Sequence, residues 1–265
     1  MRVASAAVLI VVIFGTIWIL PPWATVLMAA VVAWLAAGEL AAIASRLGAL
    51  VPSLFAGAAA AIVSVAFLAA AESTPADALT GVLLTLVLAV GAIVLSQGPP
   101  DPSAMARASA LVMIPLYVGL PLGAVTFVQC FHGPAATTWL LVMIAVSDSA
   151  QYYCGRTIGR RKLAPAVSPA KTVEGAVGGI IVATVVGAVT GPWAVPGVTI
   201  ASAGVLTIVM VLAGIVGDLF ESLLKRSAGV KDSSHLIPGH GGVLDRIDSH
   251  LFAAPVFYLF LRYLA

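Results

Sequence analysis

The chain has 265 residues, of which 61% are hydrophobic and 9% are charged, and its formal net charge is +2. Soluble domains carry roughly 25% charged residues, so this composition excludes an ordinary soluble domain and indicates several membrane spans. The small net charge, with no aromatic residues interleaved among the bases, also excludes a nucleic-acid-binding role.

Long uncharged runs predict an all-α polytopic membrane protein, because a span of about 20 apolar residues satisfies its backbone hydrogen bonds internally as a helix. Glycine and proline clusters, such as Gly133 with Pro134, separate the runs. The first run is long enough to be a retained helix rather than a secretory signal. Nine transmembrane helices are predicted, at residues 3–20, 23–44, 49–71, 79–96, 108–128, 136–153, 175–191, 198–217 and 249–264.

Residues 1–135 contain the first five predicted helices, which are rich in Ala, Val and Leu and are predicted to form a transmembrane scaffold. Residues 136–265 are predicted to be the transmembrane region that carries the catalytic residues, within one integral membrane unit. Glu39 is the one interior acid of the scaffold, and we expect it to reach the cytoplasmic interface or to pair with Arg46. Cys130 and Cys154 lie near opposite ends of one predicted helix, so no disulfide is expected between them.

The lysines and arginines, with the exception of Arg262, fall at the N-terminus and in alternate connections between the predicted helices. Arg46, Arg107 and the bases of residues 156–171 and 225–246 follow the even-numbered helices. The positive-inside rule places these loops in the cytoplasm, which puts the N-terminus in the cytoplasm and the C-terminus outside. The predicted location is a multi-pass protein of the inner cell membrane.

Polar residues enter the cytoplasmic half of the predicted helix 136–153, where Asp148, Ser149 and Gln151 interrupt an apolar segment. Buried polar groups in a span need partners or water, so this half is predicted to face a wet cavity. The alternative is a hydrogen-bonded cluster between helices.

The following connection contains residues suited to binding phosphate, because it combines hydroxyl groups, a charge and flexible backbone. These residues are Ser168, Lys171 and Thr172, and Glu174 is predicted to line the same cavity. The alternative is a helix start at which Ser168 or Thr172 is the cap. Arg160, Arg161 and Lys162 are interpreted as topology signals or contacts to anionic lipid.

Residues 217–248 form the second polar segment. Asp218 ends an apolar helix, and Asp245 and Asp248 share a helical face beyond a glycine-rich turn. Converging carboxylates suit Mg²⁺, which takes oxygen ligands and keeps positions for water and substrate phosphates, so these three acids are the predicted metal ligands. Glu221 is predicted to line the cavity. The predicted phosphate contacts of this segment are Lys225, Arg226, Lys231, His240, Gly241, Gly242 and Arg246.

Two other interpretations of the second segment fit its residues less well. Solvated salt bridges would explain any one charged pair but not the whole cluster with its glycines. A soft-metal site at His235 and His240 would lack cysteine and regular helical spacing.

The order and spacing of these residues resemble the phosphatidate cytidylyltransferases (CDP-diacylglycerol synthases). Upstream, Asp148 to Gly159 and Ser168 to Gly175 resemble two further elements of that family. Ala170 departs from the family pattern, where a Lys is common, and Gln151 stands where a small residue is usual. The matching signature consists of Ser222, Lys225, Arg226, Lys231, Asp232, Pro238, His240, Gly241, Gly242, Asp245, Arg246 and Asp248.

The resemblance implies transfer of a cytidylyl group from CTP to phosphatidate, with Mg²⁺ and a possible second monovalent or divalent cation. It implies catalytic roles for Asp218, Asp245, Asp248, Lys225 and Arg226, contact with membrane lipids, and a homodimer. By resemblance, Asp218 and Asp245 are the first Mg²⁺ ligands, and Asp248 is a second candidate or an outer-shell partner. Three alternatives stay open: a related enzyme acting on another lipid phosphate such as an ether lipid, a non-catalytic family member, and a cation-coupled transporter. A transporter would show polar or broken helices in both halves.

Overall fold

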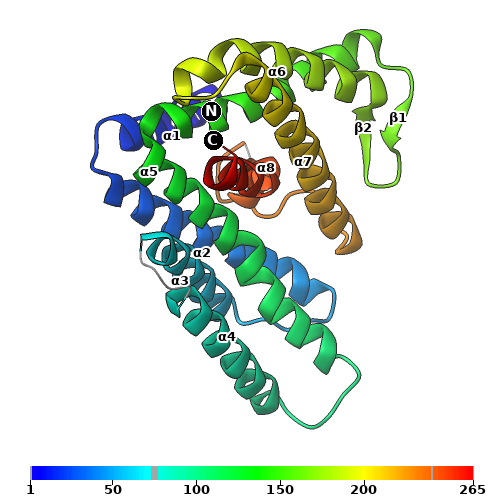
Figure 1. Cartoon of the computed structure of the whole chain (residues 1–265). Helices are drawn as coiled ribbons and strands as arrows, with labels where there is room; N and C mark the ends of the chain where they lie inside the picture. The colour runs from blue at the N-terminus through cyan, green and yellow to red at the C-terminus, as the bar shows by residue number, and fades with distance from the viewer. Residues whose placement is uncertain (1, 73–76, 240, 265) are drawn as a thin grey trace. The chain divides into compact units, whose positions relative to one another are not determined.

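The computed structural model describes residues 2–72, 77–239 and 241–264. Nearly all regular structure in these residues is helical, which confirms the predicted class, with one short hairpin that was not predicted. In chain order the elements are α1 (Arg2–Trp18), α2 (Pro22–Arg46), α3 (Ser53–Glu72), α4 (Asp77–Ser96), α5 (Ala104–Ile158), β1 (Lys162–Ala164), β2 (Ser168–Thr172), α6 (Val173–Ala194), α7 (Ile200–Ser227) and α8 (Leu244–Tyr263) (Figure 1).

Large apolar side chains cover the outside of these helices, and Leu88, Leu95 and Trp193 are among the most exposed. Such a surface is stable in lipid rather than in water, so the chain is a helical membrane protein. Five helices of the described chain are long and apolar enough to cross a membrane: Pro22–Arg46, Ala78–Ser96, Ala104–Ile158, Val173–Ala194 and Ile200–Ser227. The count of nine spans and the sides of the two termini stay predictions.

The C-terminal helix differs from its prediction. α8 begins at Leu244, five residues before the predicted span at 249–264, and its first turns carry Asp245, Arg246 and Asp248. Because of these charges it is not among the five apolar helices. Asp245, Arg246 and Asp248 therefore lie in the first turns of α8, whereas Gly241 and Gly242 precede it.

α5 contains a break at the predicted boundary between two spans. Gly133 has φ 81° and ψ −177°, a left-handed conformation that glycine adopts without a steric penalty. Pro134 follows and has no N–H to donate to the preceding turn. The structure therefore confirms the break between 108–128 and 136–153, but as a kink within a nearly continuous helix.

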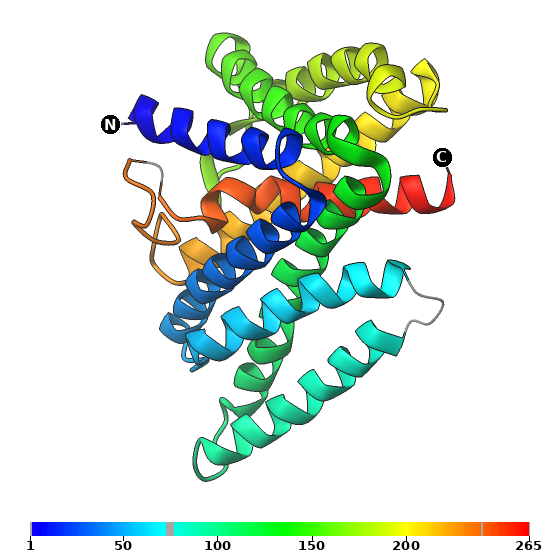
Figure 2. The same ribbon diagram turned by 90° about the vertical axis from the view of Figure 1, so that its left-hand side faces the viewer.

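The chain forms two compact units. The first contains Met1–Phe127 and Ser227–Arg246, and the second contains Val128–Arg226 and Ile247–Ala265. Residues 227–246 thus pack with the N-terminal helices, although they follow α7 in sequence. Ser5 Oγ on α1 donates a hydrogen bond of 3.2 Å to the carbonyl oxygen of Pro238 in this segment, and Figure 2 shows the segment in orange beside α1 in blue.

Small residues allow close helix packing in the first unit. A Cβ atom at Gly119 of α5 would lie 2.7 Å from the carbonyl oxygen of Ala60 in α3, and one at Gly57 would lie 3.0 Å from the Trp34 ring of α2. Close packing of helix backbones stabilises helix pairs in membranes, because the hydrophobic effect does not drive helices together in lipid.

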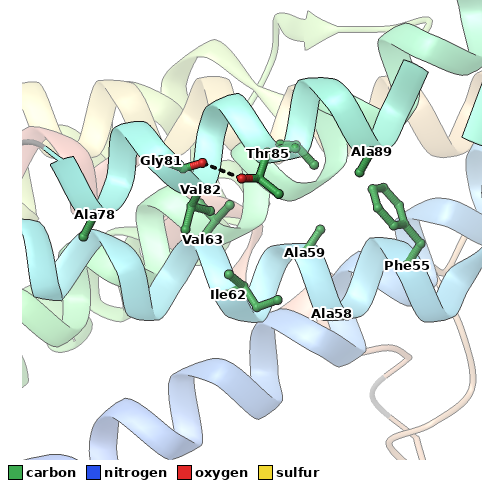
Figure 3. Close-up of a pocket in the computed structure, with 11 residues that line it drawn as sticks. Phe55, Ala58, Ala59, Ile62, Val63, Ala78, Gly81, Val82, Thr85 and Ala89 are labelled. Atoms are coloured by element: carbon green, nitrogen blue, oxygen red, sulfur yellow. Dashed lines mark hydrogen bonds between the residues drawn. The ribbon is translucent and has the colours of Figure 1, made fainter. Parts of the chain in front are cut away.

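A groove of about 510 Å³ lies between α3 and α4 in the first unit (Figure 3). Thr85 is its one hydroxyl-bearing lining residue, and its Oγ1 donates 2.8 Å to the carbonyl oxygen of Gly81 on its own helix. None of the predicted phosphate-binding residues lines this groove. The lining residues are Phe55, Ala58, Ala59, Ile62, Val63, Ala78, Gly81, Val82, Thr85, Leu86 and Ala89. Its chemistry suits hydrocarbon rather than a phosphate.

Candidate active site

The β1–β2 hairpin carries Lys171 and joins the end of α5 to the start of α6 (Figure 1). Its strands are antiparallel, with Lys162 opposite Thr172 and Ala164 opposite Ser168. Strands of three and five residues show too little alternation to be predicted from sequence. The hairpin holds Lys171 two residues before α6 begins.

Two side chains fix the start of α6. Thr172 is the N-cap, because its Oγ1 accepts a 3.1 Å hydrogen bond from the Gly175 amide, so the capping interpretation of Thr172 is confirmed. The Glu174 carboxylate accepts from the backbone amides of Arg160 at 2.9 Å and Arg161 at 3.1 Å. Both residues were predicted to contact substrate or line a cavity, and the structure shows that each also holds the hairpin against α6.

α5 and α6 approach closely at Gln151, one of the two residues that depart from the family pattern. A Cβ atom at Gly175 would lie 2.7 Å from the Gln151 carbonyl oxygen. The Gln151 side-chain amide donates to Ser147 Oγ at 3.0 Å and to Asp148 Oδ1 at 3.2 Å. Gln151 therefore orients Asp148, which is exposed on the same helix.

α7 and α8 also meet closely, at the point where Asp218 and Asp248 lie. A Cβ atom at Gly217 would lie 2.7 Å from the backbone oxygen of Asp248, and the rings of Phe220 and Phe252 are 5.9 Å apart between centroids. Glycine at 217 thus allows the contact that brings the helix carrying Asp218 against the helix carrying Asp248.

Lys171 and Asp218 form the central contact of the second unit. Lys171 Nζ lies 2.5 Å from Asp218 Oδ2, with the two side chains 21% and 26% exposed. Asp148 and Asp248 are both close enough to Asp218 for its negative charge to act on them. The structure therefore brings together residues from both polar segments of the sequence, 47 positions apart at Lys171 and Asp218.

Two ammonium groups act on the three carboxylates: Lys171 on Asp148 and Asp218, and Lys225 on Asp248. Lys225 is also paired with Glu221, so negative charge still exceeds positive charge in this cluster, which favours a cation. Among the described residues, no three His, Cys, Asp or Glu side chains are grouped closely enough to hold a metal ion by themselves. Mg²⁺ is commonly held by only one or two carboxylates, with water and substrate phosphates completing its coordination. Oxygen ligands from Asp218 and Asp248 fit that pattern.

Lys225 is buried at the end of α7 and forms an ion pair with Glu221 one turn earlier, whose side chain is fully buried. Arg226 beside it is exposed. Of these two predicted phosphate contacts, Arg226 is thus exposed to solvent, while Lys225 is buried and paired with a neighbour predicted to line the cavity.

Asp245 belongs to the first unit and closes the glycine-rich turn. Its Oδ2 accepts from the Gly242 amide at 2.7 Å and from the Ser233 amide and hydroxyl at 3.0 Å each. Gly241 has φ 80°, and a Cβ atom there would lie 2.5 Å from the same oxygen. The carboxylate predicted to bind metal thus also organises its own loop.

The remaining predicted residues of this loop occupy its surface. Lys231 and Arg246 are exposed, Gly242 is buried, and Ser168 on β2 is half-buried. His240 lies outside the described residues. Exposed bases remain available to an anionic ligand.

Glu39 was not predicted as part of this region. It is 9% exposed, and its carboxylate accepts hydrogen bonds from Ser233 Oγ and from the Leu244 amide at the start of α8. The expected pairing with Arg46 was therefore wrong for the described residues, whereas the expectation that Glu39 reaches the cytoplasmic interface stays a prediction. An acid in the middle of an apolar helix was the available signal, because a buried charge needs partners. The sequence did not show which partners.

Comparison with known proteins finds related sequences that match about half of the chain. Similar proteins include the uncharacterized protein YnbB of Escherichia coli, 46% identical over 133 residues (49% of this chain and 44% of the relative). The phosphatidate cytidylyltransferase of Haemophilus influenzae is 44% identical over 134 residues (49% and 46%). That of Helicobacter pylori J99 is 40% identical over 149 residues (56% and 55%). The chain thus spans about half the length of the curated relatives it matches.

The family model covers far more of the chain than these pairwise matches. The model of the cytidylyltransferase family matches residues 1–264. It includes both the helices of the first unit and the acidic cluster of the second. The chain therefore belongs to the cytidylyltransferase family.

Proposed function

We propose that this protein transfers a cytidylyl group from CTP to phosphatidate, forming CDP-diacylglycerol and pyrophosphate. The observation that carries the proposal is the contact of Lys171 with Asp218 beside Asp148 and Asp248. Curated relatives named phosphatidate cytidylyltransferase support the choice of substrates.

In this reaction a phosphate oxygen of phosphatidate forms a bond to the α-phosphorus of CTP. The bond from that phosphorus to the oxygen bridging to the β-phosphorus breaks, and pyrophosphate leaves with the electron pair. The nucleophile is already an anion, so no strong general base is required. The protein has to neutralise charge and hold the two phosphates in line.

Basic side chains supply the neutralisation. Lys171 and the exposed Arg226 would donate to phosphate oxygens, and the fork of donors on Arg226 suits two oxygens at once. Lys225 would do so by exchanging its contact with Glu221 for a phosphate. Lys231 and Arg246 are further exposed donors on the first unit.

Mg²⁺ is the proposed cofactor, and Asp218 and Asp248 would hold it. Bound there, the ion would neutralise phosphate oxygens and orient the leaving pyrophosphate. Asp218 is at present balanced by the Lys171 ammonium group, which shows that this carboxylate accepts a cationic partner. Asp245 remains a candidate ligand whose carboxylate has a further role in closing its loop.

The polar cluster is proposed to face the cytoplasm from the inner membrane. The alternation of basic loops along the sequence supports this orientation. CTP is available on that side.

The proposal is tested with purified protein in detergent, given CTP labelled in its α-phosphate, phosphatidate and Mg²⁺. We expect label in a CDP-lipid, none in the presence of EDTA, and recovery when excess Mg²⁺ is restored. A folded protein that forms no labelled lipid would refute the proposal. A parallel reaction with an ether-linked phosphatidate analogue separates the ester-lipid enzyme from its ether-lipid rival.

A further inference from the structure

Glu39 lies in the middle of α2, in the half of the chain that was predicted to be scaffold. Its Oε1 accepts hydrogen bonds from Ser234 Oγ at 2.6 Å and the Val243 amide at 3.0 Å. Its Oε2 accepts from Ser233 Oγ at 2.9 Å and the Leu244 amide at 2.8 Å. We call these five residues the Glu39 clamp.

The clamp uses the full hydrogen-bonding capacity of the carboxylate. An ionised carboxylate has about four acceptor sites, and each Glu39 oxygen accepts two hydrogen bonds. Leu244 is the first residue of α8, and the first amides of a helix have no partner within it. A negative charge at a helix N-terminus is also electrostatically favoured. Glu39 is therefore a cap for α8 supplied from 205 residues earlier in the chain.

The clamp is joined to the turn that Asp245 closes. The Ser233 hydroxyl lies 2.9 Å from Glu39 Oε2 and 3.0 Å from Asp245 Oδ2, so its single proton is shared between two carboxylates. A Cβ atom at Gly242 would overlap both Glu39 Oε2 and Ser233 Oγ. The glycine of the family signature thus leaves the space that Glu39 occupies.

The segment held in this way carries two exposed bases. Lys231 precedes the clamp serines by two and three residues, and Arg246 follows Leu244 by two. Both are proposed phosphate contacts. Glu39 thus ties two serine side chains next to Lys231 and two backbone amides next to Arg246 to α2, which fixes the chain close to each base.

We propose that Glu39 is a positioning residue that orders residues 231–234 and 243–246 for binding the phosphates of CTP. The role in CTP binding rests on the proposed function. It assigns to α2 a part in substrate binding that neither the sequence signature nor the scaffold interpretation contains.

The experiment compares Glu39→Gln with wild type. Gln keeps the size of the side chain but replaces an oxygen with an NH₂ group that faces donors. Asp101→Asn is the matched control, because Asp101 is another helix-start carboxylate of the first unit and bonds to Ser103 and Arg107 away from the clamp. Ser234→Ala, which removes one clamp donor, is the second variant for the case that Glu39→Gln does not fold.

The first readout is limited trypsin digestion without substrate, followed by mass spectrometry. Cleavage after Lys231 and Arg246 is compared with cleavage after Lys162, an exposed reference on β1. We expect cleavage at the two clamp-flanking sites to rise about 10-fold in Glu39→Gln, less in Ser234→Ala and not in Asp101→Asn, since cleavage follows the population of the opened segment. Unchanged cleavage in folded clamp variants would overturn the ordering role, whether or not the protein is an enzyme.

The second readout is the split between KM for CTP and kcat. A positioning role predicts that KM rises about 10-fold in Glu39→Gln, whereas a merely structural role lowers the amount of active protein and leaves KM unchanged. Asp101→Asn should keep the wild-type KM. Increased cleavage with an unchanged KM would overturn the proposed link to CTP binding. If the wild-type protein forms no CDP-lipid, the proposed function is refuted, but the trypsin result still shows whether Glu39 orders the residues near Lys231 and Arg246.

Discussion

Two carboxylates of the first unit, Glu39 and Asp245, differ in their partners from two carboxylates of the second unit, Asp218 and Asp248. In the first unit, Glu39 accepts four hydrogen bonds and Asp245 accepts from both Ser233 and Gly242. In the second unit, the contacts described for Asp218 are Lys171 and Ser222, and Asp248 accepts from the Ser249 amide. Glu39 and Asp245 accept hydrogen bonds mainly from backbone amides and serine hydroxyls, whereas few uncharged groups donate to Asp218 and Asp248.

This difference separates structural from reactive carboxylates. Removing an acceptor that satisfies several buried donors leaves those donors unpaired, which costs stability. A carboxylate whose main partner is one mobile ammonium group can exchange that partner for a metal ion or give it up to a phosphate. Groups held in such unbalanced charge clusters are the expected functional ones.

The largest expected effect is on Asp218. Asp218→Asn should lower CDP-lipid formation by about 10³-fold, because it removes a charge that would bind Mg²⁺ next to the reacting phosphates. Its partly exposed ion pair should contribute at most about 1 kcal/mol to stability. Turnover of labelled CTP and the melting temperature in detergent measure the two effects. Full Mg²⁺-dependent activity in a folded variant would contradict the assignment.

A smaller effect is expected for Lys171. Lys171→Met should raise KM for CTP by about 10- to 100-fold, since a hydrogen bond to a charged group contributes about 1.5–3 kcal/mol. Lys162→Met is the control, because Lys162 is exposed on the neighbouring strand of the same hairpin and its change should leave KM within about threefold. Equal effects of the two variants on KM would show that Lys171 contributes only to the overall positive charge of the hairpin and does not contact a phosphate directly.

For Asp245 the expected effect is mainly on stability. Asp245→Asn should lower the free energy of unfolding by about 1–3 kcal/mol, because the Ser233 and Gly242 amides lose a charged acceptor. Denaturant unfolding in detergent measures this loss. If Asp218→Asn destabilises the protein as much as Asp245→Asn, the distinction between the two groups of carboxylates is lost.

The smallest expected effect concerns the cap of α6. Thr172→Val should cost about 1 kcal/mol of stability, because the Gly175 amide loses its acceptor. Thr172→Ser keeps a hydroxyl and should retain most of that stability. A rise in KM for CTP in Thr172→Val, with little loss of stability, would instead assign the hydroxyl to phosphate binding.

Much of the fold was predictable because helix formation is local. Apolar runs located the helices, and Gly133 with Pro134 located the break in α5. Thr172 was recognised as a possible cap from its position before an apolar run. The β1–β2 hairpin was missed, since its short strands pair through backbone groups that carry no sequence pattern.

The site was predictable as a set of residues but not as a set of contacts. Charge in an apolar chain identified Lys171 and Asp218, because a membrane protein keeps buried ionisable groups only where they have partners or a function. Their direct contact depends on how the hairpin and α7 pack. The partners of Glu39 were even harder to predict from the sequence, because they are about 200 residues away in the chain.

The sequence alone determined that this protein is helical and membrane-embedded, and it identified two polar segments with the chemistry of phosphate and metal binding. Hydropathy and residue type decide these properties at each position. Only the tertiary structure decided which carboxylates are saturated by their own chain and which are not. Hydrogen bonds and ion pairs between distant segments depend on how those segments pack. That packing gives Glu39 four hydrogen-bond donors, so it holds a loop, and gives Asp218 a lysine partner that it could exchange for a metal ion or give up to a phosphate.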